Sequence, residues 1–332
     1  MVEYKGVLIC GEVAGGKIAP ITLELLGIGR KLADDLGEEL SVLLLGSSLS
    51  EAARGAIVFG ADKAYVADDP LLSDYNSDTY TAAVTKACEQ LSPSILLLGQ
   101  TDMGRDIAPR VAARLRTGLS VDCIELGIDP HTKLLIQTRP VYGGNALATM
   151  VCESARPQMA TVRFKSMSAL PPDDSRQGEI TNIDLGIDAS AIKSKFVERV
   201  KEEAEGVKLE DANVVIGGGR GVGSAENFDM LWELAHLFGG AVGGTRVACD
   251  EGWLASTLQI GQTGKIVSPN LYIAVGLSGA MQHIAGCSGA KNIVAINKDP
   301  EANIFKVAHY GIVGDFKQAL PALTEKCKEL LG

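Results

Sequence analysis

The sequence predicts an α/β protein with two domains, an N-terminal three-layer αβα domain and a C-terminal doubly wound domain built on a parallel sheet. Short apolar runs rich in Val, Ile and Leu alternate with helical patterns toward both ends of the chain, as is typical of parallel strands linked by helices. A charge-dense stretch at 193–211 separates the two regions and is expected to form a solvated helix and connector. We therefore expect domains at 1–190 and 213–332, joined by a charged connector at 191–212.

The N-terminal domain is expected to open with four strands and four helices in alternation. Its strand patterns are largely apolar, which indicates a parallel sheet covered on both faces. Gly37 follows the first helix in a position suited to a C-cap, and Thr101 with Asp102 can cap the fourth. The expected strands are 7–10, 40–45, 64–67 and 95–98, and the expected helices are 21–36, 51–59, 77–91 and 104–116.

After residue 121 the pattern changes to consecutive strands without clear helices. Runs at 134–138, 146–151 and 158–162 predict an antiparallel extension of the first domain. A final strand of this domain is expected at 180–187.

The C-terminal domain carries small or polar residues directly after its apolar runs. Four β-branched runs, at 214–216, 271–277, 293–296 and 310–313, are each followed by such residues and then by a helical pattern, and a further strand is expected at 241–245. Ligands of open parallel sheets bind beyond the carboxyl ends of the strands. The pattern therefore predicts a site for a long, polar, nucleotide-like ligand.

Bulk composition excludes several classes of partner. The net charge of −10 disfavours nucleic acid and anionic membrane surfaces, which require a basic footprint. No apolar run approaches the roughly 20 residues that a membrane-spanning helix needs, so no membrane insertion is expected. The seven cysteines are widely spaced and form no CxxC pair, which indicates reduced thiols rather than a metal site. Because no signal-peptide pattern opens the sequence, a cytoplasmic location is expected.

The glycine run at 217–223 does not fit the dinucleotide fingerprint GxGxxG. Val222 and Ser224 stand where that spacing requires glycine. The next helix is expected to begin at Ser224 as its N-cap, with Glu226 in its first turn, and a carboxylate there repels a phosphate. No acidic residue stands at the end of the second strand, where a carboxylate could bind the ribose hydroxyls of NAD. An ordinary NAD site is therefore disfavoured.

The segment 278–283 makes a better phosphate site. A strand ends there in a hydroxyl and a glycine, and the following helix has no acidic residue in its first turn. Exposed backbone N–H groups and a positive helix end suit a pyrophosphate. A tight strand-to-helix turn is the alternative interpretation, and His283 either faces a ligand or packs in the core.

Other candidates at the same edge leave two interpretations open. The segment 260–265 offers amide and hydroxyl groups between glycines, or is a surface turn. Arg246 is a ligand-binding residue or an exposed partner of a salt bridge. Asn297 and Asp315 bind a nucleotide or serve local structure, and Asp315 can cap the helix that follows it.

The motifs taken together resemble the alpha subunit of electron transfer flavoproteins. The resemblance is carried by 217–228, 245–246, 260–286 and 293–315, and 104–115 matches the first domain of that family. It implies an FAD-binding domain at 213–332 and an N-terminal domain that packs on a beta subunit in a heterodimer.

The resemblance also implies roles for single residues. Thr263 is expected near the flavin N5, His283 near the pyrimidine carbonyl O2, and Arg246 beside the ring, where it would favour anionic forms. The residues expected to contact FAD are Arg220, Thr245, Arg246, Ile260, Gly261, Gln262, Thr263, Ser278, Gly279, Ala280, Met281, Gln282, His283, Asn297, Asp315 and Phe316.

Members of this family carry electrons between dehydrogenases, such as acyl-CoA dehydrogenases, and a further acceptor. The resemblance implies an electron carrier rather than a stand-alone enzyme, and leaves open a bifurcating role with NADH and ferredoxin. Two other functions compete with it, an NAD- or nucleotide-dependent oxidoreductase and a nucleotide-sensing module. The oxidoreductase would need an acid–base residue in the cleft and an acid after the second strand, where Thr245 and Arg246 stand.

Overall fold

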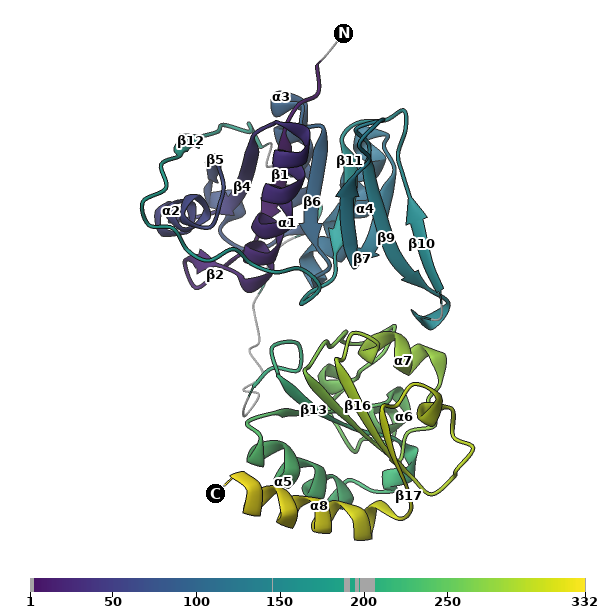
Figure 1. The fold of residues 1–332 in the computed structure, drawn as a ribbon. Coiled ribbons are helices and arrows are strands. Elements are labelled where there is room, and N and C mark those ends of the chain that lie inside the picture. Colours follow the sequence, from purple (N-terminus) through teal and green to yellow (C-terminus); the bar gives the residue numbers. More distant parts are fainter. Residues whose placement is uncertain (1–2, 145, 188–191, 195–196, 198–206, 332) are drawn as a thin grey trace. The chain divides into compact units, whose positions relative to one another are not determined.

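A computed structural model describes residues 3–144, 146–187, 192–194, 197 and 207–331. The chain divides into two compact units (Figure 1). The first comprises Met1–Pro140 and Leu147–Arg199, and the second comprises Val141–Ala146 and Val200–Gly332. The predicted connector at 191–212 lies largely outside the described residues. The last part of that stretch belongs to the second unit, since Leu209 and Ala212 are buried in its core.

A seven-stranded sheet forms the centre of the first unit. Its strand order is β12-β5-β4-β1-β6-β11-β7, and the pairings between neighbouring strands are parallel. The strands of this sheet are β1 Val7–Gly11, β4 Leu40–Gly46, β5 Lys63–Asp68, β6 Ile95–Gly99, β7 Leu119–Cys123, β11 Gln158–Val162 and β12 Glu179–Asn182. Two shorter strands, β2 Val13–Ala14 and β3 Lys17–Ile18, form a separate antiparallel pair.

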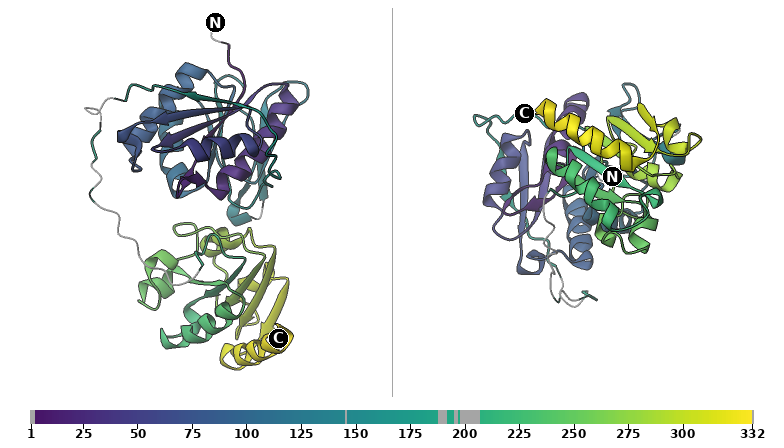
Figure 2. Two further views of the ribbon diagram at one scale, coloured as in Figure 1. Left: turned by 90° about the vertical axis from the view of Figure 1, so that its left-hand side faces the viewer. Right: turned by 90° about the horizontal axis from the view of Figure 1, so that it is seen from below.

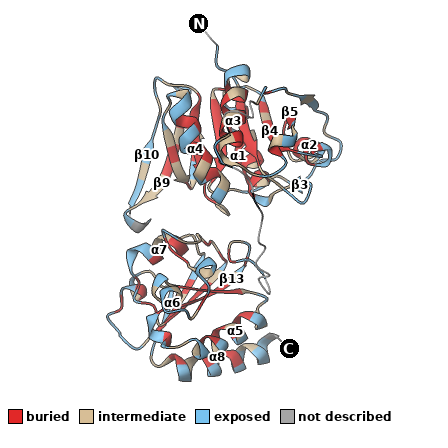
Figure 3. Cartoon of the chain, turned by 180° about the vertical axis from the view of Figure 1, so that it is seen from behind, coloured by how far each residue is buried: buried red, intermediate tan, exposed pale blue. Residues whose placement is uncertain are grey.

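Alternation along each apolar strand sorts its side chains into two cores. In β1, Val7 and Ile9 enter one core, whereas Leu8 and Cys10 enter the other. Helices α1 Pro20–Leu36 and α2 Ser50–Val58 cover the first core, and α3 Ser77–Leu91 and α4 Asp102–Leu115 cover the second. Buried positions are concentrated in the central strands and the inner helix faces (Figure 3). This is the predicted three-layer αβα arrangement.

In the first unit, the predicted ends of the helices agree closely with the structure. Gly37 ends α1 with a left-handed φ of 71°, which favours glycine. The hydroxyl of Thr101 accepts a hydrogen bond from the N–H of Gly104 and caps α4.

The predicted antiparallel extension is wrong for one of its three strands. A small sheet of order β10-β9-β8 is present, built from β8 Glu125–Ile128, β9 Leu135–Val141 and β10 Ala146–Met150, and β8 and β9 pair in antiparallel fashion. However, β11 lies between β6 and β7 in the main sheet and is parallel to both. All five residues of β11 are buried, as expected of a central strand covered on both faces.

The predicted strand at 180–187 is shorter than expected. Only β12, at Glu179–Asn182, pairs with β5, and the chain continues from 183 to 187 without strand structure. There, the N–H of Ile183 still donates to the carbonyl of Val66 on β5 at 2.9 Å. Leu185 packs into the core beneath α3 and α4, so burial rather than strand pairing accounts for this apolar residue.

The second unit is a doubly wound domain on a five-stranded parallel sheet of order β14-β13-β15-β16-β17. Helices α5 and α8 lie side by side on one face (Figures 1 and 2), and α7 covers the other. Its elements are β13 Val214–Gly218, α5 Asp229–Leu237, β14 Ala241–Gly244, α6 Arg246–Asp250, β15 Leu271–Val275, α7 Met281–Cys287, β16 Asn292–Asn297, β17 Tyr310–Val313 and α8 Phe316–Leu331.

The helix after the glycine run does not begin at Ser224 as predicted. Two single-turn 3₁₀ helices, Arg220–Val222 and Glu226–Phe228, come first, and α5 begins at Asp229. The side-chain amide of Asn227 donates to the carbonyl of Val222 at 2.6 Å and ties the two turns together. Glu226 therefore lies in a 3₁₀ turn ahead of α5, and its carboxylate is not in the first turn of that helix as predicted.

Candidate functional site

The sheet order of the second unit places a topological switch point between β13 and β15. The chain moves from β13 to β14 on one side and then returns to β15 on the other, and ligands of open α/β sheets bind at the carboxyl edge of such a point. A cavity of about 970 Å³ lies at this edge, which is within the size range of small-molecule and cofactor sites.

Thirteen of the sixteen predicted FAD-contacting residues line this cavity. They come from the segments after β13, β14, β15 and β16 and from the segment between α6 and β15, and they are Arg220, Thr245, Arg246, Ile260, Gly261, Gln262, Thr263, Ser278, Gly279, Ala280, Gln282, His283 and Asn297.

Three predicted residues do not line the cavity. Met281 is exposed, and Phe316 is buried in the core beneath α5 and α8. Asp315 lies just before α8, where its carboxylate accepts the N–H of Lys317 at 2.9 Å and pairs with Lys298 at 3.0 Å. The N–H of Lys317, followed by Lys298, lowers the pKa of Asp315.

The cavity also contains residues that the sequence analysis missed. Those after β16 follow Asn297 directly, so the strand-end rule that selected Asn297 could have found them. The additional lining residues are Gly221, Val247, Gln259, Gly276, Asp299, Glu301, Ala302 and Asn303.

Glycines let backbone segments meet closely around the cavity. Gly279 has a φ of +81°, and a Cβ there would lie 2.1 Å from the backbone nitrogen of Ile304. A Cβ on Gly221 would lie 2.9 Å from the Cα of Gly276. Any side chain at these positions would force the walls of the cavity apart.

Residues at the start of α7, among them Ala280 and Gln282, line the cavity. The carbonyl of Ala280 accepts the N–H groups of His283 and Ile284, whereas the N–H groups that open a helix have no acceptor within it. The first turn of α7 has no acidic residue, as predicted. Since α7 has only seven residues, individual N–H groups matter here more than the dipole of the helix.

The segment at 259–265 is a closed turn attached to α7. The side-chain amide of Gln259 donates to the hydroxyl of Thr263 at 3.0 Å, and the N–H of Gln262 donates to the carbonyl of Gln282 at 2.7 Å. Its amide and hydroxyl groups are therefore held at the cavity by hydrogen bonds.

Arg246 is an exposed charged residue of this wall. Thr245 caps α6, because its hydroxyl accepts the N–H of Ala248 at 3.4 Å. The guanidinium of Arg246 forms an ion pair with Asp250 at 3.3 Å, with 73% of its side chain exposed. Such an exposed pair contributes little to stability, so both proposed roles of Arg246 are compatible with its position.

His283 uses both of its ring nitrogens within the protein. Nδ1 lies 3.0 Å from the carbonyl oxygen of Ile260, and Nε2 lies 2.8 Å from the hydroxyl of Tyr272. Burial lowers the pKa of His283 to about 4, so the imidazole is neutral near pH 7. Donation to a flavin carbonyl, as the resemblance implies, would require one of these two bonds to be exchanged.

Asn297 also has a structural task. Its amide donates to the carbonyl of Leu277 at 2.7 Å, and its side-chain oxygen accepts the N–H of Asp299 at 3.0 Å. The first bond joins the end of β16 to the segment after β15, and the second fixes the turn that follows β16.

Among the described residues, neither a cluster of metal-ligating side chains nor a membrane-spanning helix is present. No group of three or more His, Cys, Asp or Glu side chains there could hold a metal ion. In the same residues, no helix is long and apolar enough to cross a membrane.

Comparison with known proteins gives matches over nearly the whole chain. Residues 7–187 match the electron transfer flavoprotein domain, and residues 208–288 match the electron transfer flavoprotein FAD-binding domain. The chain is 46% identical to electron transfer flavoprotein subunit alpha of Thermoanaerobacterium thermosaccharolyticum over 99% of its length and 100% of that protein. It is 44% identical to the subunit of the same name in Megasphaera elsdenii, covering 100% of this chain and 99% of that protein. It is 43% identical to protein FixB of Clostridium saccharobutylicum, covering 99% and 98%.

Proposed function

Because this chain belongs to the alpha subunits of electron transfer flavoproteins and binds FAD, we propose that it holds FAD at the carboxyl edge of β13 and β15 and works as the electron-carrying half of a heterodimer with a beta subunit. The observation that carries this proposal is the cavity of about 970 Å³ that thirteen of the expected residues line. Its size, its backbone donors and the absence of acidic residues from the first turn of α7 suit a dinucleotide.

The residues divide into groups by their chemistry. The N–H groups of 278–282 would hold the diphosphate, since backbone donors suit its oxygens. Gln262 and Thr263 offer an amide and a hydroxyl to the flavin. Asp299 and Glu301 lie at the same cavity, and their carboxylates can accept hydrogen bonds from ribose hydroxyls.

FAD supplies the redox chemistry when bound, accepting electrons from one protein and passing them to another. The residues of the chain bind and orient it and set its electrostatic surroundings. Arg246 places a positive charge at the cavity, whereas His283, neutral near pH 7, adds none. A cation beside the ring favours its reduced, anionic form.

The partners follow from the family and are part of the proposal. The name subunit alpha of the relatives implies a further subunit, which we propose to be the beta subunit. The donor is proposed to be a flavoenzyme of the acyl-CoA dehydrogenase type. A bifurcating variant would add NADH and ferredoxin, with a second flavin held mainly by the beta subunit.

The test is a flavin count on the complex purified from cells that produce the chain together with the beta subunit. The proposal predicts a yellow complex from which acid releases FAD. One FAD for each heterodimer indicates simple electron carriage, and two indicate bifurcation. A colourless complex that does not take up added FAD would refute the proposal.

The second candidate function is a nucleotide-sensing module, which would bind the same class of ligand but would not transfer electrons. Reduction of the complex with dithionite, followed by reoxidation with a dye acceptor, separates the two. A carrier transfers its electrons to the dye, and a sensor that holds only adenine nucleotide shows no bleaching.

A further inference from the structure

A hydrogen bond between two side chains spans the turn at 259–265 in the wall of the cavity. The amide Nε2 of Gln259 donates to the hydroxyl oxygen of Thr263 at 3.0 Å, and both residues line the cavity. Thr263 is expected beside the flavin. Gln259 is not among the residues expected to contact FAD, and the proposed function gives it no task.

The main chain of Gln259 is held on both sides. Gln259 forms a bridge with Gly244, the last residue of β14, and the N–H of Ile260 donates to the carbonyl of Gly244 at 2.8 Å. Across the turn, the carbonyl of Gln259 accepts the N–H of Lys265 at 2.7 Å. A Cβ on Gly264 would lie 2.3 Å from the same carbonyl oxygen, so the turn is tightly closed. The side chain of Gln259 therefore starts from a fixed position.

The side chain of Thr263 is much less restrained. Thr263 is an exposed residue, and a threonine can occupy several χ1 rotamers while its hydroxyl rotates. Within the part of the chain that the structure describes, the bond from Gln259 is the only hydrogen bond that this side chain makes. This bond therefore selects one rotamer of Thr263 and one direction of its hydroxyl.

The direction of the bond determines what Thr263 can offer to a ligand. A hydroxyl has one hydrogen and two lone pairs. Since the amide N–H of Gln259 occupies a lone pair of the Thr263 oxygen, the hydroxyl hydrogen points away from Gln259 and is available to an acceptor in the cavity. An oxidised flavin ring presents acceptors at N1, N5 and both of its carbonyl oxygens, so Thr263 is preorganised as a donor to it.

We infer that Gln259 is a positioning residue of the FAD site: its amide holds the Thr263 side chain in one rotamer, with the hydroxyl hydrogen free to donate to the flavin. The inference rests on the proposed function. It gives Gln259 a role that is exerted through Thr263.

An uncharged amide suits this role. A carboxylate at position 259 could only accept a hydrogen bond, and it would draw the hydroxyl hydrogen of Thr263 away from the ligand. A lysine could donate, but it would place a second cation at a cavity that already contains Arg246. Glutamine supplies the donor without changing the charge beside the flavin.

The first test measures the Thr263 side chain in the full chain purified with its beta subunit, after FAD has been removed. Three-bond couplings of the Thr263 methyl carbon give the populations of its χ1 rotamers, and the Thr263→Ser variant, which lacks the methyl group, assigns the signal. We expect one dominant rotamer in the wild type. Gln259→Met keeps the length of the side chain and removes the amide, so it should give averaged couplings.

The second test measures FAD binding. Gln259→Met should raise the dissociation constant of FAD about three- to tenfold, because Thr263 must then be ordered when FAD binds. In a Thr263→Val background the same change should raise it less than about twofold, since no hydroxyl is left to position. Gln90→Met is the matched control. It removes an amide that donates to the carbonyl of Asp184 at 3.1 Å in the first unit, and it should leave the dissociation constant unchanged.

The third test measures the direction of the bond. Gln259→Glu places a carboxylate where the amide stands, and the hydroxyl of Thr263 should then donate to residue 259 instead of to the flavin. FAD labelled with ¹⁵N reports this change at N5, beside which Thr263 is expected, because a hydrogen bond shifts the resonance of a ring nitrogen. The same substitution in Thr263→Val gives the effect of the added charge alone. We expect a larger shift of N5 when the hydroxyl is present.

Two results would overturn the inference. One is a Gln259→Met variant in which the Thr263 rotamer and the affinity for FAD are both unchanged. The other is an equal loss of affinity from Gln259→Met in the wild-type and Thr263→Val backgrounds, which would show that Gln259 acts without Thr263. Failure of the proposed function looks different, because the wild-type complex would then bind no FAD while the couplings of Thr263 could still be measured.

Discussion

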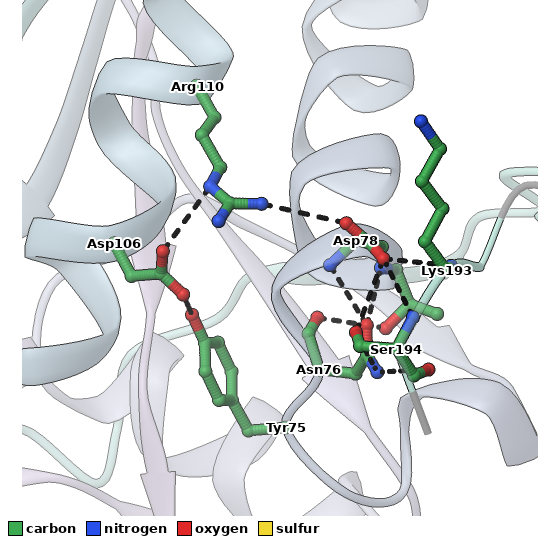
Figure 4. Close-up of polar contacts among 8 residues, drawn as sticks. Tyr75, Asn76, Asp78, Asp106, Arg110, Lys193 and Ser194 are labelled. Atoms are coloured by element: carbon green, nitrogen blue, oxygen red, sulfur yellow. Dashed lines mark hydrogen bonds and ion pairs between the residues drawn. The ribbon is translucent and has the colours of Figure 1, made fainter. Parts of the chain in front are cut away.

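The carboxylate of Asp78 holds Ser194 by two hydrogen bonds: its Oδ2 atom accepts the backbone N–H and the side-chain hydroxyl of Ser194, both at 3.2 Å (Figure 4). It also accepts the N–H of Lys193 at 2.9 Å. Asn76, which caps α3, donates to the carbonyl of Ser194 at 3.1 Å. Residues 193 and 194 are thus tied to the start of α3, and Arg110 links Asp78 to Asp106 in the same network.

Asp78→Ala should release Lys193 and Ser194 from α3. Amide hydrogen exchange at both residues is expected to accelerate by at least about tenfold, because their N–H groups lose their acceptor. Asp106→Ala is the control, since it breaks the bond to Tyr75 without touching Ser194. Equal exchange rates in the wild-type protein and in Asp78→Ala would contradict the prediction.

The same contact has a defined pH dependence. The N–H of Lys193, followed by the bonds from Ser194, lowers the pKa of Asp78 below its ordinary value of 3.8. A lowered pKa means that the contact is intact above pH 3.8 and is lost only as the pH falls through the lowered value. Protection of Ser194 should therefore persist at pH 4, as amide exchange at decreasing pH can show.

Gly279→Ala should damage both the second unit and its FAD site. Its φ of +81° disfavours a side chain, and the new methyl group would meet the backbone of Asn303 and Ile304. We expect a loss of about 3 kcal/mol or more in the free energy of unfolding and at least tenfold weaker FAD binding. Gly239→Ala is the control: its φ is +57° with nothing within 4 Å of the Cβ position, so only about 1 kcal/mol should be lost.

Arg246→Ala should lower the reduction potential of bound FAD. If the flavin ring lies beside Arg246, removal of the cation destabilises the reduced, anionic form, by on the order of 30 mV for a two-electron couple. Asp250→Asn removes the ion-pair partner of Arg246 at 3.3 Å and should shift the potential the opposite way. Spectroelectrochemical titration of both variants checks the signs. Shifts of the reduction potential in the same direction in both variants would contradict the placement of Arg246 beside the flavin ring.

Glu12→Gln should stabilise the first unit above neutral pH. Burial is the main reason that the pKa of Glu12 is raised. The protonated side chain therefore contributes stability below the ordinary pKa of a glutamate, and this contribution is lost as the pH rises through the raised pKa. Glutamine is neutral throughout and can still accept the hydroxyl of Thr101, at 2.5 Å from Oε1 in the wild type. Urea unfolding should show a gain at pH 8 that shrinks toward pH 4.

Glu24→Gln is the matched control for this prediction. The pKa of Glu24 is also raised by burial, but both of its oxygens are acceptors, for the N–H groups of Lys165 at 2.9 Å and Met167 at 3.2 Å. An amide has only one oxygen, so this variant should lose stability at pH 8. A gain in stability of similar size in both variants would contradict the prediction, because removal of the buried charge alone would then determine the change.

Much of the fold could be predicted from sequence periodicity, because strands such as β1 and β6 are apolar throughout and α3 is amphipathic from end to end. The placement of β11 could not, since its neighbours β6 and β7 are set by tertiary pairing and not by any local pattern. The start of α5 was misjudged for a related reason. A serine before a glutamate is a common N-cap pattern, but the bond from Asn227 to Val222 favours two 3₁₀ turns there.

The site was predictable to the extent that it lies at strand ends. The strand-end rule and the family resemblance brought out residues such as Ser278 and Asn297, which do line the cavity. The resemblance also selected Phe316, whose side chain is buried in the core. Gln259 could not be found from the sequence, because no local pattern shows that its amide meets the hydroxyl of Thr263.

We propose that FAD lies in the cavity at the carboxyl edge of β13 and β15. A crystal structure of the heterodimer grown with saturating FAD would locate the cofactor. We expect FAD density in this cavity, with the diphosphate at the N–H groups of 278–282 and the flavin next to Thr263. An empty cavity, with the FAD of the complex bound elsewhere, would contradict it.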